Sequence, residues 1–357
     1  MLKGKSLVEL ATAVQAQAES KVDIVADTRD MTFSATENRA TLVIGDPGNP
    51  QADVGLTSHA LNQLTDHVGI PAKYAKVMQE RAPELLERNV QHWLTREPSM
   101  RMVRTINGAD GGIARAFLSN RYQRIENDRV LASVLPELMG YDVRVVSSEL
   151  TDTRMYLKFI FPKMEGEVGK GDVVQYGFIL ANSEIGLGAF SVSPFVMRLV
   201  CLNGLTLPKE IDDARMRKTH LGSALSAQVD YYAEETIKAD DTAMLLKLRD
   251  TMRAYADKDR WNAVLDKMRA ANNIEVVDPI ATVGRVASML VLPKTESDAV
   301  LTNFLRDNAT TQWGLVNAIT AVANKADSYD RACELEQMGG RILTLPASDF
   351  RVLAKAA

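Results

Sequence analysis

The fold of this chain is decided by strands within residues 141–205, and the clearest of them is Arg154-Met155-Tyr156-Leu157-Lys158-Phe159-Ile160-Phe161. Successive side chains of a strand point to opposite faces, so each position has a fixed side. One face carries the apolar residues Met155, Leu157, Phe159 and Phe161, and the other carries Arg154, Tyr156, Lys158 and Ile160. The sequence therefore predicts a strand with one core face and one basic, aromatic face.

Further strands lie close to this one in the chain. Residues 141–147, 173–180 and 187–192 are strand-like, and residues 128–139 have a helical pattern with Asp128 as a cap. From about residue 225 the pattern is almost wholly helical. This order predicts an α+β fold, in which an antiparallel β-meander sheet is backed by helices on one face and followed by a mostly helical C-terminal region.

The N-terminal part mixes helices with a hairpin. Residues 6–21 predict an opening helix, residues 22–27 and 40–44 a hairpin, residues 46–50 a proline-containing loop, and residues 57–94 three helices. A chain of 357 residues is long for one core. We expect three parts: an N-terminal hairpin and helices at 1–100, an α+β core with the antiparallel sheet at 101–224, and a helical C-terminal region at 225–357.

The apolar stretch at residues 193–205 is compatible with two structures. Ser193 as N-cap, Pro194 at the first helical position and Gly204 past the end favour a helix. The dipeptide Asn203-Gly204 favours a hairpin turn instead. We expect the helix, because three boundary signals agree. Arg198 would then need a carboxylate, a carbonyl cluster or a phosphate, because an unpaired charge on an apolar surface is costly.

Bulk composition limits the class of protein. Apolar residues make up 46% of the chain and charged residues 25%, as in ordinary globular proteins, and the formal net charge is -4. Any site for an anionic polymer must therefore be local. Cys201 and Cys333 are too far apart in sequence for a disulfide framework, and polar residues interrupt the N-terminal apolar segment. We expect a cytoplasmic protein without membrane contact.

Positive charge gathers between residues 101 and 129. Six arginines there face three carboxylates. The glycine-bearing stretch 107–112 is not a Walker loop, because no Gly-Lys-Ser/Thr follows it. It suits either a loop that approaches a ligand or a plain turn between strands at 102–106 and 113–118, with the arginines paired to carboxylates.

Residues suited to catalysis or metal binding are few. His59 and His67 lie two helical turns apart, too far to share a metal, and no nucleophile elbow or dinucleotide fingerprint occurs. We therefore expect no enzymatic activity, no metal and no cofactor. An enzyme whose site is assembled only in space ranks last among the functions considered.

Five short motifs carry a family resemblance. They are Leu56-Thr57-Ser58-His59-Ala60, Leu118-Ser119-Asn120-Arg121-Tyr122 leading to Asn127, Asn182-Ser183-Glu184-Ile185-Gly186 followed by Phe190, the run from Arg198 to Leu205, and the run from Trp313 to Thr320. With them the chain resembles a phage- and plasmid-borne family known as domain of unknown function 932. The sheet with a helix behind it is also similar in outline to the RecT, Redβ and Erf single-strand annealing proteins, by fold-level analogy.

These features predict a function. Cations follow phosphates, and aromatic rings stack on bases with about 1–3 kcal/mol per base. We expect a non-enzymatic protein of phage or plasmid origin that binds and anneals single-stranded DNA as a homo-oligomer, because the resemblance implies rings or filaments in which modest basic patches add up. The DNA-contacting residues would be Arg101, Arg104, Arg115, Arg121, Tyr122, Arg124, Arg144, Arg154, Tyr156, Lys158 and Arg198.

Two alternatives stay open. The basic, aromatic strand face also suits a solvated outer surface without a ligand. The protein as a whole also suits an interaction factor that binds a host protein and thereby inhibits or remodels a host defence or replication complex.

Overall fold

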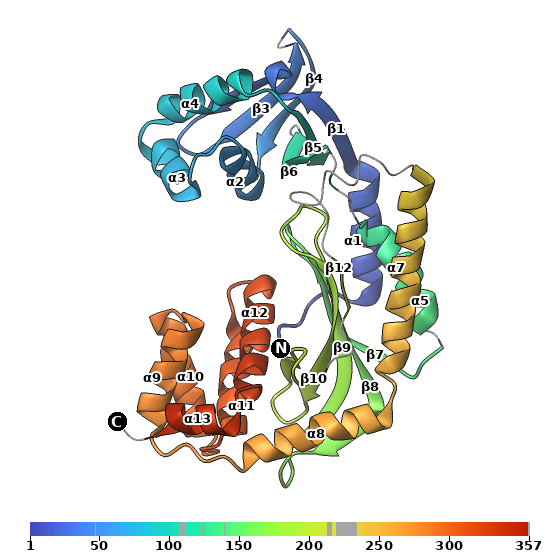
Figure 1. Ribbon diagram of the computed structural model, residues 1–357, viewed down its shortest axis with the longest axis vertical. Helices are drawn as coiled ribbons and strands as arrows, with labels where there is room; N and C mark the ends of the chain where they lie inside the picture. The colour runs from blue at the N-terminus through green and yellow to red at the C-terminus, as the bar shows by residue number, and fades with distance from the viewer. Residues whose placement is uncertain are drawn as a thin grey trace.

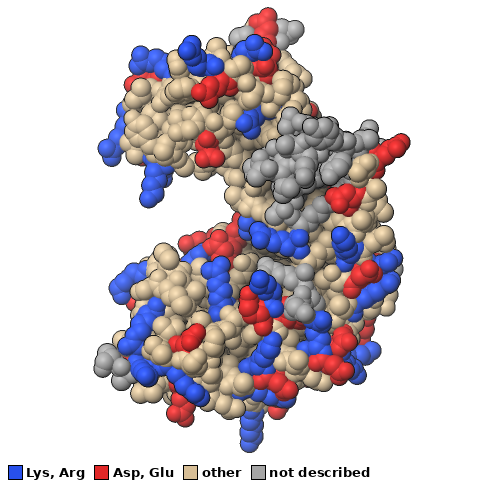
Figure 2. Space-filling model, in the orientation of Figure 1, with Lys and Arg blue, Asp and Glu red and all other residues tan. Residues whose placement is uncertain are grey.

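The molecule consists of two lobes, each built on a sheet of six strands. A computed structural model describes residues 1–46, 48–106, 112–120, 122, 125–138, 140–212, 216–218 and 234–355. Figure 1 shows one sheet in an N-terminal lobe and the other in a larger lobe that also holds the C-terminal helices. Figure 2 shows that the surface is hollowed between the two lobes, which gives the molecule the outline of a letter C.

The N-terminal lobe holds strands β1 to β6 and helices α2 to α4. The strands are β1 (Lys21–Asp27), β2 (Met31–Ala35), β3 (Ala40–Asp46), β4 (Asn49–Leu56), β5 (Met100–Ile106) and β6 (Gly112–Ser119), in the spatial order β1-β5-β6-β4-β3-β2. Their pairings are antiparallel except for β4 with β6. Helices α2 (Ser58–His67), α3 (Ala72–Arg81) and α4 (Pro83–Arg96) cover one face and bury its apolar residues, among them Leu42 and Val103.

The expected hairpin between residues 22–27 and 40–44 is wrong. β1 pairs with β5, with Ile24 opposite Val103, and β3 pairs with β2, a strand that the sequence analysis lacked. The available signal was the alternation of buried Met31 and Phe33 with exposed neighbours. The expected loop at 46–50 is short, because β3 and β4 pair as far as Asp46 and Asn49.

The second sheet, here called the central sheet, is the predicted antiparallel meander. It contains β7 (Arg144–Leu150), β8 (Met155–Glu167), β9 (Val173–Asn182), β10 (Phe190–Arg198) and β11 (Asn203–Thr206) in the order β11-β10-β9-β8-β7, and β12 (Met216–Lys218) pairs with β10. The α+β class is thereby confirmed. The expected second part, 101–224, supplies strands to both sheets, because β5 and β6 lie inside the N-terminal one.

Helices cover both faces of the central sheet, not one as expected. Helices α1 (Leu7–Ser20), α5 (Asn127–Leu138) and α7 (Glu234–Ala254) lie on one face, and α11 (Gln312–Val322) and α12 (Tyr329–Leu343) on the other (Figure 1). The remaining helices are α8 (Lys258–Asn272), α9 (Pro279–Leu290), α10 (Lys294–Arg306) and α13 (Ala347–Ala354). Among the described residues, no helix has the length and apolar character that a membrane span requires.

The predicted helix at 193–205 is wrong as well, and the hairpin alternative is correct. β10 and β11 pair antiparallel with Arg198 opposite Asn203, so the turn is at residues 199–202, not at Asn203-Gly204. The apolar run suits a strand buried on both faces as well as it suits a helix. Pro194 has no N–H to donate, but this removes no hydrogen bond between β10 and β9. Its carbonyl accepts from the Leu207 N–H, on the side of β10 that faces away from β9. The N and O of one residue point to the same side of an antiparallel strand, so the missing N–H would also have faced away from β9.

The basic, aromatic face of β8 is an interior surface. Tyr156 is 1% exposed and Lys158 0%, because α12 covers them. The Lys158 Nζ donates to both Glu336 carboxylate oxygens, at 2.8 and 2.6 Å, and the Tyr156 hydroxyl donates to Asp330 Oδ1 at 2.8 Å. This face of β8 therefore packs against polar residues of α12. The alternation of side chains along the strand had instead suggested a face open to solvent.

Loss of the Lys158 charge is expected to destabilise the protein strongly. Lys158→Met leaves the carboxylate of Glu336 buried without its partner, which costs about 3–5 kcal/mol of unfolding free energy. Urea titration followed by tryptophan fluorescence measures it. Lys163→Met on the same strand is the matched control, because its pair with Asp142 is exposed and such pairs contribute about 0–1 kcal/mol. Equal losses in the two variants would contradict the expectation.

Candidate functional site: a charged joint and an aromatic groove

The residues predicted to contact DNA lie in different environments. Arg104, Arg115, Tyr156 and Lys158 are buried, Arg101, Tyr122, Arg154 and Arg198 are half-buried, and Arg144 is exposed. Arg121 and Arg124 lie outside the described residues. Three of the half-buried arginines bond within the protein: Arg101 to His67, Arg154 to the Leu187 carbonyl, and Arg198 to Asp172. The set therefore does not form one open basic surface.

Arg104 is the centre of a charged cluster where the two sheets meet, here called the joint. Its guanidinium, 0% exposed on β5, donates to both carboxylate oxygens of Asp23 on β1 at 2.9 and 3.0 Å. It also donates to Glu126, before α5, at 2.7 and 3.3 Å. It donates a further hydrogen bond, of 3.0 Å, to the carbonyl of Glu184, in the loop after β9. One side chain thus ties the N-terminal sheet to two segments of the larger lobe.

Two more cations complete the joint. Lys21 donates to Glu126 and, at 3.2 Å, to Glu184 Oε1, which also accepts from the backbone N–H of Asn127 at 2.7 Å. Glu184 Oε2 accepts no hydrogen bond, although Arg115 Nη1 lies 3.7 Å away. That Arg115 nitrogen likewise donates no hydrogen bond. The joint therefore holds two buried polar atoms that the protein leaves unsatisfied.

The pKa values of the two glutamates of the joint are shifted in opposite directions. Burial raises the pKa of Glu126, but Arg104 and Lys21 outweigh it and bring the pKa down to about 2. Burial, together with the neighbouring charge of Glu126, raises the pKa of Glu184 above its ordinary value. Glu126 is thus held ionised by its cations, whereas Glu184 has a tendency to keep a proton.

Three of the motifs that carry the family resemblance come together at the joint. The Asn182 side chain donates to the Ile125 carbonyl at 2.7 Å and to Asn127 Oδ1 at 2.8 Å. On the side of the N-terminal lobe, His59 on α2 hydrogen-bonds the Ile185 carbonyl at 2.8 Å. Residues 56–60, 125–127 and 182–186 are therefore neighbours in space.

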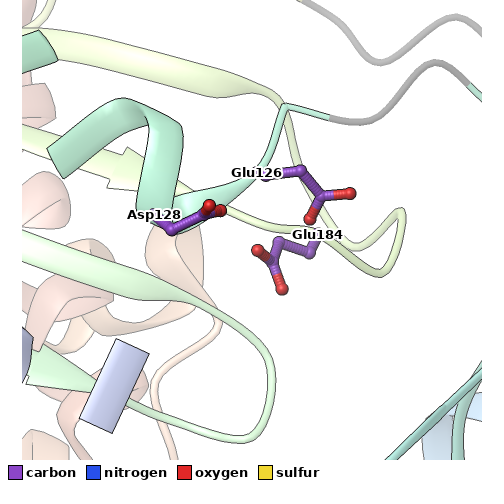
Figure 3. Close-up of side chains that lie close together, drawn as sticks. All are labelled: Glu126, Asp128 and Glu184. Atoms are coloured by element: carbon purple, nitrogen blue, oxygen red, sulfur yellow. The ribbon is translucent and has the colours of Figure 1, made fainter. Parts of the chain in front are cut away.

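Glu126, Asp128 and Glu184 form a carboxylate cluster within the joint. Figure 3 shows Glu126 and Asp128 on the segment that enters α5 and Glu184 on a neighbouring loop. One ligand oxygen from each lies within 4.8 Å of the others. The sequence analysis missed this group, because Glu184 is far from the other two in the chain and only the family motifs mark both segments.

A second candidate site is a groove on the N-terminal lobe. It encloses about 560 Å³ between the end of α2, the start of α3 and one side of α4, and its lining includes His67, Tyr74, Asn89 and Trp93. Tyr74 is 52% exposed and Trp93 37%. Exposed cations follow the same two helices, namely Lys73, Lys76, Arg88 and Arg96. Basic side chains project from this part of the lobe in Figure 2.

Arg101 supports this groove from behind. Its Nη2 donates to His67 Nδ1 at 2.5 Å, and Ser99 Oγ lies 3.2 Å from His67 Nε2. Burial, and then the charge of Arg101, lower the pKa of His67 to about 4, so this ring is neutral at pH 7. Two carboxylates, Asp66 and Glu97, also border the groove. The groove is therefore aromatic, and its charged lining residues are acidic.

Comparison with known proteins identifies the family. A family model described as Domain of unknown function (DUF932) matches residues 116–337. The chain belongs to this family. No curated protein and no solved structure matches it. The matched range of DUF932 begins inside β6 and ends inside α12, so it includes the three clustered carboxylates and Glu336 and leaves out Arg104 and the aromatic groove.

The charge of Glu126 is expected to stabilise the joint in a pH-dependent way. Because its folded-state pKa of about 2 lies below the ordinary 4.5, this stabilisation is complete above about pH 4.5 and is lost as the pH falls toward 2. Glu126→Gln should cost about 3–5 kcal/mol at pH 7, because Arg104 stays buried with one partner fewer. Urea unfolding at several pH values measures it.

The matched control is Glu80→Gln, because Glu80 is exposed and pairs weakly with Lys76. It should change the unfolding free energy by less than about 0.5 kcal/mol. A Glu126→Gln variant that unfolds with the same free energy and the same acid dependence as the parent would contradict the assigned role of the joint.

Proposed function

We propose that this DUF932 protein binds single-stranded nucleic acid, single-stranded DNA first of all, with the aromatic groove as its base-stacking site. The observation that supports the proposal is the exposure of two aromatic rings, Tyr74 on α3 and Trp93 on α4, along one groove, together with exposed cations on the same two helices. Stacking on such rings contributes about 1–3 kcal/mol per base and tolerates any sequence, because every base has a π face.

The phosphate contacts of this proposal come from the helices, not from the sheet. Arg104, Arg115 and Lys158 point into internal carboxylates or carbonyls, so a phosphate would have to displace them from buried positions. Lys73, Lys76, Arg88 and Arg96 are exposed on α3 and α4, and Arg144 keeps its exposed place on β7. The proposed contact surface therefore moves from β8 to the N-terminal lobe.

The charge balance favours action as an oligomer. The chain has a formal net charge of -4, and Asp66 and Glu97 lie beside the groove, so one copy offers a strand few uncompensated cations. Several copies on one strand add their modest affinities without new contacts. The proposal therefore includes a homo-oligomer on single-stranded DNA, in which annealing would bring two bound strands together.

The experiment is fluorescence anisotropy with a labelled oligothymidylate at several salt concentrations. The protein should bind it with an affinity that falls as salt rises, since phosphate contacts release counterions. Tyr74→Ala and Trp93→Ala should each weaken binding by about 5- to 100-fold, which corresponds to the loss of one stacked base.

Leu85→Ala is the matched control, because Leu85 is 42% exposed on α4 and does not line the groove. Its affinity for the oligonucleotide should equal that of the parent. The absence of salt-sensitive binding, or an equal loss in the Leu85 variant, would refute the proposed site.

A second candidate function, binding of a protein partner, rests on the other face of the N-terminal sheet. Val25, Met100 and Ile113 are 50, 45 and 51% exposed, and strand alternation puts them on the face turned away from α2 to α4. Exposed apolar groups of this kind often mark protein contacts. This second function would be favoured if the chain does not bind the oligonucleotide but keeps a bound protein partner after nuclease treatment.

A further inference from the structure

We infer that Glu126, Asp128 and Glu184 form a binding site for one divalent cation of the oxygen-preferring class, such as Mg²⁺, Mn²⁺ or Ca²⁺. The site lies at the joint and not at the aromatic groove. It is independent of the proposed binding of nucleic acid.

The geometry of the three carboxylates suits a shared cation. Oxygen ligands lie about 2.0–2.6 Å from such an ion, so two of them are at most about 5 Å apart. The ligand oxygens of Glu126, Asp128 and Glu184 lie within 4.8 Å of one another. Figure 3 shows that they come from two separate segments, the start of α5 and the loop after β9. A bound ion would therefore cross-link these segments.

An unsatisfied buried oxygen points to a missing ligand. Glu184 is 2% exposed, and its Oε2 accepts no hydrogen bond, while its Oε1 already accepts from Lys21 and from the Asn127 backbone. A buried acceptor without a hydrogen-bond partner destabilises the folded state, and more so when it is charged. Arg115 and Arg104 approach Oε2 only to 3.7 and 3.9 Å. A cation bonded to Oε2 would supply the missing interaction.

Charged side chains of both signs surround the cluster. Among the described residues they are the carboxylates of Asp23, Glu126, Asp128 and Glu184 and the cations Lys21, Arg104 and Arg115. Asp128 is half-buried, and no described residue pairs with it, so it can approach an ion from the solvent side. All three ligands are carboxylates, which selects hard cations over zinc or copper.

Isothermal titration calorimetry of the full chain with MnCl₂, MgCl₂ and CaCl₂, without nucleic acid, tests the inference. We expect one ion per chain. Asp128→Asn should weaken binding at least tenfold and leave the fold intact, because it removes a ligand and none of the ion pairs of Arg104.

Asp53→Asn is the control, because Asp53 is an exposed carboxylate on β4, a strand that contributes no residue to the joint. Its affinity for the ion should equal that of the parent. The inference is overturned if the parent protein binds none of the three ions at millimolar concentration, or if Asp128→Asn and Asp53→Asn bind as the parent does.

Discussion

The arrangement of the two lobes depends on the buried guanidinium of Arg104. It reaches β1, the segment before α5 and the loop after β9, and it bonds carboxylates or a carbonyl in each of them. A guanidinium is suited to this position because its planar set of donors can serve several acceptors and stays charged when buried. Without it, Asp23 and Glu126 would each lose a buried cationic partner.

A second buried ion pair joins the central sheet to the C-terminal helices. Lys158 on β8 and Glu336 on α12 are both 0% exposed, and they pair across the face of the central sheet that the C-terminal helices cover. Buried pairs of this kind add little net stability, but loss of one partner is costly, so they select one arrangement over its alternatives. Both lobes and the C-terminal helices are thus positioned by cations inside the protein.

This internal use of cations bears on function. A concentration of arginines in the sequence is compatible with a ligand surface or with internal ion pairs, and here the joint uses Arg104 and Arg115 internally. The surface carries an aromatic groove and exposed cations on the same helices, and one oxygen of Glu184 is among the buried polar atoms of the described residues that have no hydrogen-bond partner. The first supports the proposed binding of nucleic acid, and the second supports a cation site.

The sequence by itself determined the elements whose signals are local. The capped helix α1, the alternation of β8 and the meander could be predicted, because Ser6 caps its own helix and Met155, Leu157 and Phe159 alternate within one strand. The hairpin at 193–205 and the internal position of Lys158 follow from contacts made in the folded chain. Glu336 lies 178 residues after Lys158, so no local pattern could show that the polar face of β8 meets a carboxylate and not water.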